Sequence, residues 1–178
     1  MNKKITFGTK LRSYGSLDLE LRGSSKLTIG DRFTIASGGM VNPLGRNIKS
    51  AIRIDNNAQI VIGHNVGMSC VVLWAKEKIT IGNNATIGAD VIIMDSDMHS
   101  LNYKERRDWS TDLINAKIEP ITIGDDVFIG TRSIISKGTS IGDRSIIASG
   151  SIVTKSIPSD EIWGGNPAKF IKKVSAIE

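Results

Sequence analysis

The chain has 178 residues, an aromatic content of 5% and a formal net charge of +5 at pH 7. This length predicts one domain over residues 1–178, and neither a transmembrane run nor the apolar segment of a signal peptide follows Met1, so we expect a cytoplasmic protein. The single cysteine, Cys70, excludes an internal disulfide, and the scattered cations favour an anionic small molecule over nucleic acid as partner.

The N-terminal segment, residues 1–28, is predicted to form strands. Residues 17–21 alternate strictly between apolar and polar types, as a half-buried strand does. Residues 26–30, Lys-Leu-Thr-Ile-Gly, are the first copy of a tag that recurs at 59–63, 78–82 and 120–124. Each copy predicts an extended step with two inward aliphatic side chains that ends at a glycine corner. We expect the repeating structure to begin near Leu17 or Leu27.

Six-residue periodicity is irregular between Ile29 and Leu73 and becomes regular from Ile81. Pro43 and the residues after it interrupt the first region, which predicts a loop at a corner. Hexads then open at Ile81, Ile87 and Ile93. The next hexad should open with an aliphatic residue at position 99, but His99 stands there instead.

Residues 99–120 show no hexad pattern and form a long excursion from an otherwise regular repeat. Long loops on rigid scaffolds usually carry function, so this break is the best sequence indication of an active site. Histidine titrates near neutral pH, which makes His99 a candidate general base. If residues 95–99 are extended, Asp95 and Asp97 share one face with His99 and either carboxylate could orient the imidazole. Alternatively, both aspartates only occupy a turn.

Perfect hexads run from Ile123 to Pro158, and each opens with a branched aliphatic residue. This period is typical of a hexapeptide β-helix, in which three hexads make one triangular coil and inward side chains stack about 4.8 Å apart. The fifth hexad position is also expected to face inward and is small or β-branched: Val127, Ser133, Thr139, Ser145 and Ser151. Residues 159–178 are predicted to cap the last coil, because a solenoid end exposes unpaired strand edges.

Metal and covalent chemistry fit the residues poorly. A catalytic zinc usually has three protein ligands, and two distant histidines with one cysteine do not supply them. Covalent catalysis by Cys70 requires a nearby base, whereas its apolar neighbours indicate a packed or substrate-lining thiol.

Several motifs make the chain resemble the hexapeptide-repeat acyltransferases. They are Asp-Ser-Asp-Met-His at 95–99, the excursion that closes on Pro-Ile-Thr-Ile-Gly-Asp-Asp-Val-Phe-Ile-Gly at 120–130, Gly-Ser-Ile-Val-Thr-Lys at 150–155 and Gly-Gly-Asn-Pro-Ala-Lys at 164–169. The similarity covers roughly residues 54–173 and is strongest to the maltose and galactoside O-acetyltransferases and to O-acetyltransferases of surface polysaccharides, with residues 74–82 leaning toward the latter.

The resemblance implies an all-β fold, a left-handed parallel β-helix with a protruding loop and a short C-terminal cap. It also implies a homotrimer that binds acetyl-CoA in a groove between neighbouring subunits, with His99 as catalytic base. Phe128 replaces the tryptophan of the family's Val-Trp-Ile-Gly motif, so an indole hydrogen bond is lost there. The residues implied to line the acetyl-CoA groove are Phe128, Gly130, Thr131, Ser149 and Gly150, with Thr154, Lys155 and Lys169 toward the nucleotide. The candidate substrate contacts are Ser69, Cys70, Trp74, Tyr103 and Arg106.

The expected reaction is therefore direct acetyl transfer from acetyl-CoA to a sugar or polysaccharide hydroxyl, without an acyl-enzyme or a metal. Two alternatives remain open: N-acetylation of an amino-sugar nucleotide, and a β-helix that serves only as a structural subunit. A γ-type carbonic anhydrase shares the fold but requires three histidines, and this chain has two.

Overall fold

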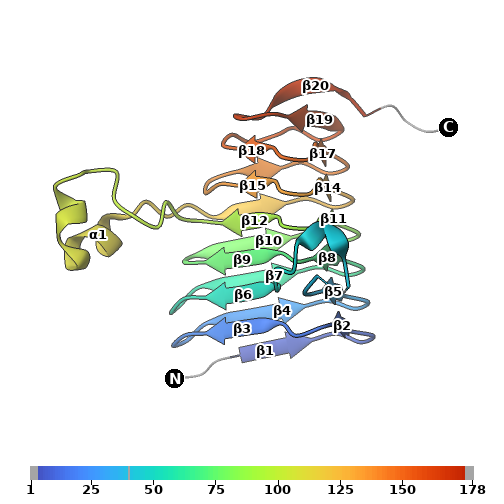
Figure 1. Ribbon diagram of the computed structural model, residues 1–178, viewed down its shortest axis with the longest axis horizontal. Coiled ribbons are helices and arrows are strands. Elements are labelled where there is room, and N and C mark those ends of the chain that lie inside the picture. The colour runs from blue at the N-terminus through green and yellow to red at the C-terminus, as the bar shows by residue number, and fades with distance from the viewer. Residues whose placement is uncertain (1–3, 40, 175–178) are drawn as a thin grey trace.

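A computed structural model describes residues 4–39 and 41–174, which wind into a single stack of triangular coils (Figure 1). Three sheets form the sides of the stack, and each sheet gains one strand per coil. Within each sheet the pairs are parallel, except that β19 and β20 pair antiparallel. The repeat and the parallel pairing confirm the predicted parallel β-helix. The few residues of the predicted N-terminal strands and C-terminal cap that fall in 1–3 and 175–178 lie outside the described chain.

We call the three sides faces A, B and C, in the order in which the chain visits them. Face A contains β1 (Lys4–Phe7), β4 (Lys26–Ile29), β7 (Gln59–Ile62), β10 (Lys78–Ile81), β13 (Ile121–Ile123) and β16 (Ser140–Ile141). Face B contains β2 (Arg12–Tyr14), β5 (Thr34–Ala36), β8 (Gly67–Ser69), β11 (Thr86–Ile87), β14 (Phe128–Ile129), β17 (Ile146–Ile147), β19 (Glu161–Gly164) and β20 (Lys169–Lys173). Face C contains β3 (Asp18–Leu21), β6 (Ala51–Ile54), β9 (Val72–Ala75), β12 (Ile92–Met94), β15 (Ile134–Ile135) and β18 (Ile152–Val153).

The core is a set of stacked aliphatic side chains. The four recurring tags lie one above another on face A, so that Leu27, Ile60, Ile79 and Ile121 are in register and buried. The small fifth positions of the hexads are buried as expected, and their hydroxyl groups bond to backbone; Ser133 Oγ, for example, donates to Gly130 O at 2.8 Å. Stacked Ile side chains therefore supply most of the buried apolar surface. At the corners, the buried hydroxyl of Ser133 is satisfied by its hydrogen bond to the backbone.

The β-helix begins earlier than predicted. Strands β1 and β2 already pair with β4 and β5, so the first coil starts at Lys4 rather than near Leu17 or Leu27. This first coil lies at the open end of the stack, and its inward side chains, among them Ile5, Phe7 and Leu19, remain substantially exposed.

Two segments leave the regular path. The interruption at Pro43 forms a 3₁₀ helix, η1 (Pro43–Gly45), beside face B. The larger excursion follows β12 and holds a second 3₁₀ helix, η2 (Glu105–Arg107), and the single α-helix of the described residues, α1 (Trp109–Asn115). It projects away from the stack to one side (Figure 1).

Candidate active site

The excursion leaves and re-enters the stack through a short antiparallel neck. Ser96 and Ile118 form an antiparallel bridge, Asp97 N donates to Lys117 O at 3.0 Å, and Glu119 N donates to Asp95 O at 3.0 Å. These bonds fix the two ends of an otherwise irregular segment. His99 follows the outgoing strand of the neck by two residues, so its backbone is tied to the rigid stack.

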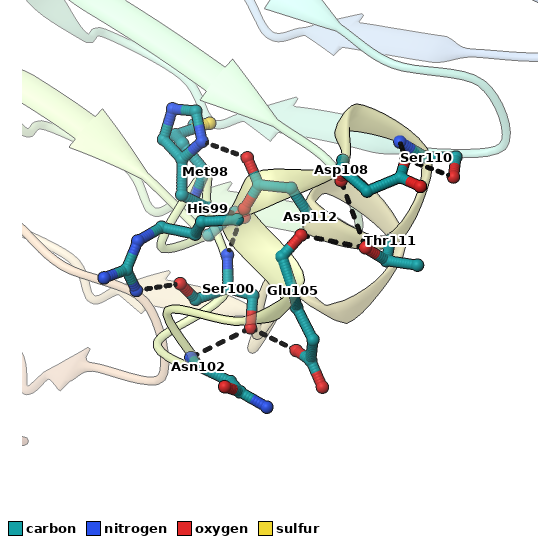
Figure 2. A network of polar contacts seen from close by, with 11 residues as sticks. Met98, His99, Ser100, Asn102, Glu105, Asp108, Ser110, Thr111 and Asp112 are labelled. Carbon is teal, nitrogen blue, oxygen red and sulfur yellow. Dashed lines mark hydrogen bonds and ion pairs between the residues drawn. The ribbon is translucent and has the colours of Figure 1, made fainter.

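His99 faces a carboxylate within the excursion (Figure 2). Its Nδ1 lies 2.6 Å from Asp112 Oδ2, and Ser100 N donates to the other carboxylate oxygen at 2.8 Å. The Asp112 side chain is 5% exposed, whereas that of His99 is 58% exposed. An ionised carboxylate at Nδ1 selects the imidazole tautomer that carries its proton there. The Nε2 atom is then free to accept a proton from a substrate.

Helix α1 places Asp112. Asp108 caps the helix, because its carboxylate accepts from Ser110 N at 2.8 Å, and Asp112 N donates to Asp108 O at 2.9 Å one turn later. Arg106 donates to Ser100 O at 2.6 Å and so fixes the backbone just after His99. The orienting carboxylate is therefore fixed by a helix cap and by the loop that precedes it.

The pKa of Asp112 is held below its ordinary value. The hydrogen bond from His99 is the main cause, and the Ser100 N–H and the charge of Arg106 act in the same direction against the cost of burial. Asp112 thus stays ionised at neutral pH and can stabilise an imidazolium on His99.

The prediction that Asp95 or Asp97 orients His99 is wrong. Residues 95–99 do not stay extended, since Met98 has φ +64°, and the three side chains do not share a face. Asp95 is fully buried and accepts from the backbone N–H groups of residues 76–78, at 2.7, 2.8 and 2.8 Å. Burial raises the pKa of Asp95, and these three hydrogen bonds oppose that rise. Asp97 instead pairs with Lys137 at 2.7 Å.

A separate hollow of about 450 Å³ lies on face B. It brings together three of the residues implied to contact acetyl-CoA, Phe128, Thr131 and Ser149, with the candidate substrate contact Ser69. Asn42, from the loop before η1, also lines it and donates from Nδ2 to Ser69 Oγ at 2.8 Å. No pattern in the sequence indicated that Asn42 would contact Ser69. The two residues meet only because the loop before η1 folds over face B.

The remaining residues implied for acetyl-CoA lie at corners and near the C-terminal end. A Cβ on Gly130 would lie 2.5 Å from Ser149 N, so that corner requires glycine, and the φ of +74° at Gly150 favours it there. Thr154 and Lys155 follow β18 on face C, whereas Lys169 begins β20 on face B. Thr154 and Lys155 therefore share a corner with the excursion, which follows β12 two coils below.

The other candidate substrate contacts are dispersed. Trp74 lies with His99 in a hollow of about 210 Å³ on face C. Cys70 is fully buried, and a Cβ on Gly45 would lie 2.2 Å from its Sγ, so the packed-thiol interpretation holds and a substrate-lining thiol does not. Tyr103 is exposed on the excursion beside Arg107, and Arg106 serves the loop as described above. Across residues 4–39 and 41–174, no three His, Cys, Asp or Glu side chains gather as metal ligands would.

Comparisons with known proteins find that the chain is similar to acetyltransferases. The model of the "hexapeptide repeat of succinyl-transferase" matches residues 120–155. The galactoside O-acetyltransferase of Escherichia coli is 35% identical over 54% of this chain and 45% of its own length. A protein of E. coli named as a lipopolysaccharide biosynthesis O-acetyl transferase is 26% identical over 86% of this chain and 74% of its own. The crystal structure of a maltose O-acetyltransferase from Clostridium difficile has a TM-score of 0.60 at 34% identity, over 70% of this chain and 64% of the other.

These matches confirm the resemblance: the chain has the repeat and the left-handed parallel β-helix of the hexapeptide-repeat acetyltransferases. The chain spans less than half the length of the galactoside enzyme. No helix among the described residues is both long and apolar enough to cross a membrane.

Proposed function

We propose that the protein is an acetyl-CoA-dependent O-acetyltransferase that acts on a sugar or polysaccharide hydroxyl, with His99 as general base. The His99–Asp112 pair carries the proposal, because its 2.6 Å contact prepares an exposed imidazole for proton transfer. The acetyltransferase names of the relatives support the reaction class, and a structural neighbour of 27% identity was crystallised with acetyl-CoA.

In the proposed reaction, His99 Nε2 takes the proton of the acceptor hydroxyl while its oxygen attacks the thioester carbonyl carbon. Backbone N–H groups stabilise the negative charge on the tetrahedral oxygen, and the ionised Asp112 stabilises the imidazolium. Collapse breaks the carbon–sulfur bond, and the imidazolium returns the proton to the leaving thiolate of CoA. The acetyl group passes directly to the acceptor, so no side chain becomes acylated.

The donor groove is proposed to lie in the face B hollow, against Phe128, Gly130, Thr131, Ser149 and Gly150. Thr154, Lys155 and Lys169 would approach the nucleotide. His99, however, lies beside face C of the same chain. We therefore assign each active site to two copies, with face C of one subunit against face B of the next in a homotrimer.

Outward side chains of the stack favour that pairing. One of the two outward columns of face C is aliphatic above Asp18, with Ala51, Val72, Ile92, Ile134 and Ile152 in register. Phe128 and Ile146 are outward and in register on face B, whereas outward positions of face A are mostly polar. Since exposed apolar stripes mark interaction sites, faces B and C are the natural contacts between copies.

Charges in the first coils support the same contact. Lys10, Arg12 and Arg32 line a hollow on the face B side and form no ion pair among the described residues. Asp18, which forms no ion pair among the described residues, stands on face C in the same coil as Arg12. Face B of one copy against face C of the next at the same height would bring these opposite charges together.

The test is release of CoA from acetyl-CoA in the presence of sugars, sugar nucleotides and aminoglycoside antibiotics. Release with a hydroxyl acceptor, and its loss in His99→Ala, is the expected result. Release with amino sugars alone would favour the N-acetyltransferase alternative. Calorimetry with acetyl-CoA separates both enzymes from a structural subunit, for which no binding is expected.

A further inference from the structure

The hollow beside His99 is lined by charged and aromatic side chains from face C and from the excursion. Its lining residues are Arg22, Arg53, Asp55, Trp74, Lys76, Met98, His99, Trp109 and Leu113. A hollow of about 490 Å³ on the lower coils shares Arg53 and Trp74 with it. Together the two hollows form a depression along face C that ends at the candidate base.

Register explains why these groups meet. Glu20, Arg53, Trp74 and Met94 occupy the same outward position of four successive strands on face C. In-register parallel strands stack such positions about 4.8 Å apart, so the column is continuous. The Arg53 guanidinium lies 4.2 Å from the centre of the Trp74 ring.

Two hydrogen-bond donors in this column have no partner. Trp74 Nε1 and Arg53 Nε are buried and make no hydrogen bond within the described residues. Arg53 Nε lies 3.4 Å from Glu20 Oε2 and 3.5 Å from Asp55 Oδ1, which are ion-pair distances without hydrogen-bond geometry. Asp55 Oδ1 likewise makes no hydrogen bond within the described residues. Buried polar groups are almost always satisfied, so the unused indole donor of Trp74 indicates an absent acceptor group, which the neighbouring Arg53 guanidinium can also contact.

The hollow also has an excess of cations. Arg22, Arg53 and Lys76 line it with the single carboxylate of Asp55. Glu20 and Asp55 neutralise part of the arginine charge, whereas Lys76 makes no ion pair within residues 4–39 and 41–174. Arginine binds carboxylate and phosphate through two parallel N–H donors, so an oxyanion suits these unused groups better than a neutral hydroxyl does.

We propose that this hollow binds the acceptor sugar through an anionic group, a carboxylate or a phosphate, held by Arg53 with Arg22 and Lys76. This inference rests on the proposed acetyltransferase function and specifies its acceptor as an acidic glycan. Trp109, whose side chain is largely exposed at the rim, supplies an apolar surface for the sugar ring. The anion at Arg53 then directs a neighbouring hydroxyl to His99 Nε2.

The test compares charged and neutral sugars that are otherwise alike. The first pair is p-nitrophenyl β-D-glucuronide and p-nitrophenyl β-D-glucoside, and the second is glucose 6-phosphate and glucose. Binding to His99→Ala is measured by saturation-transfer NMR, and acetylation by the unsubstituted protein is measured by CoA release. We expect the charged member of one pair to bind about 10-fold or more tightly than the neutral member. The pair that responds distinguishes a carboxylate from a phosphate.

Arg53→Met keeps an unbranched side chain in the column and removes the charge. It should weaken binding of the charged probe about 10-fold or more while the neutral probe and the KM for acetyl-CoA stay unchanged. Lys26→Met, on the outward side of face A, is the matched control. It should change neither the binding of the two probes nor the KM for acetyl-CoA. Equal binding of charged and neutral probes, or an equal effect of Arg53→Met on both, overturns the inference. Absence of acetyl transfer with a retained charge preference would instead sink the proposed function.

Discussion

The coils and the excursion bury opposite kinds of side chain. The coils bury stacked columns of Ile, Leu and Val, with small Ser, Thr and Ala side chains at the corners. Within residues 95–120, the buried side chains are mostly polar, among them Asp95, Ser96, Ser100 and Asp112. Large apolar side chains of the excursion stand outside, with Trp109 at 72% and Ile114 at 80% exposed. The coils are thus held by apolar burial, whereas the excursion is held by hydrogen bonds and exposes apolar side chains on its surface.

This difference predicts that chemistry and stability respond to different substitutions. His99→Ala should reduce acetyl transfer about 100- to 10,000-fold, because a positioned general base contributes that much. Its thermal stability should fall only modestly, since the imidazole is mostly exposed and the interaction lost is the single bond to Asp112. Steady-state rates and calorimetric melting of the same preparation check both parts. If His99→Ala binds acetyl-CoA and keeps near-normal turnover, His99 is not the general base.

Asp112→Asn should lower the rate at least about 10-fold, but less than His99→Ala does, because the base remains and loses only its charged partner. The pKa of Asp112 is lowered in the folded protein, so its ionised form contributes stability above the ordinary carboxyl pKa. That contribution is lost as the pH falls through the folded pKa. The difference in Tm between the two proteins should therefore shrink below about pH 4. A difference that widens in acid would contradict the assignment.

A core substitution should show the reverse pattern. Ile135→Ala removes a fully buried side chain from face C and should cost about 2–5 kcal/mol of unfolding free energy. Ile114→Ser, on the exposed side of α1, should cost the isolated chain little and should instead weaken association between copies. Denaturant unfolding and light scattering check the pair. Equal destabilisation of the chain by both would mean that the excursion has a core of its own.

The smallest expected effect concerns the C-terminal lysines. Replacing Lys155 and Lys169 together by Ala should raise the KM for acetyl-CoA, because both are exposed where the nucleotide is proposed to lie. Exposed charges are screened by salt, so the change should fade as ionic strength rises. Steady-state kinetics at low and high salt check this. An unchanged KM at low salt would leave these lysines as part of the cap alone.

The coils were predictable because their contacts repeat. Each inward Ile meets the equivalent side chain of the next coil, so the six-residue spacing predicts the faces, the tags and the small corners. Asp112 was not predictable in this way. It reaches His99 across 13 positions of a segment without period, through a cap at Asp108 and a turn at Met98. The prediction that Asp95 or Asp97 orients His99 assumed an extended strand through residue 99, and the turn at Met98 ends that strand.

The central claim is that His99 of one copy completes a donor groove on the next, and subunit mixing tests it most directly. Ser149→Trp fills the face B hollow and keeps His99, whereas His99→Ala keeps the hollow. Each variant alone should be nearly inactive. Dissociated, mixed in equal amounts and reassembled, they should regain about a quarter of the normal activity, because random assortment in a cyclic trimer makes one site in four intact. A mixture as inactive as its parents, despite proven exchange of subunits, would contradict a shared site.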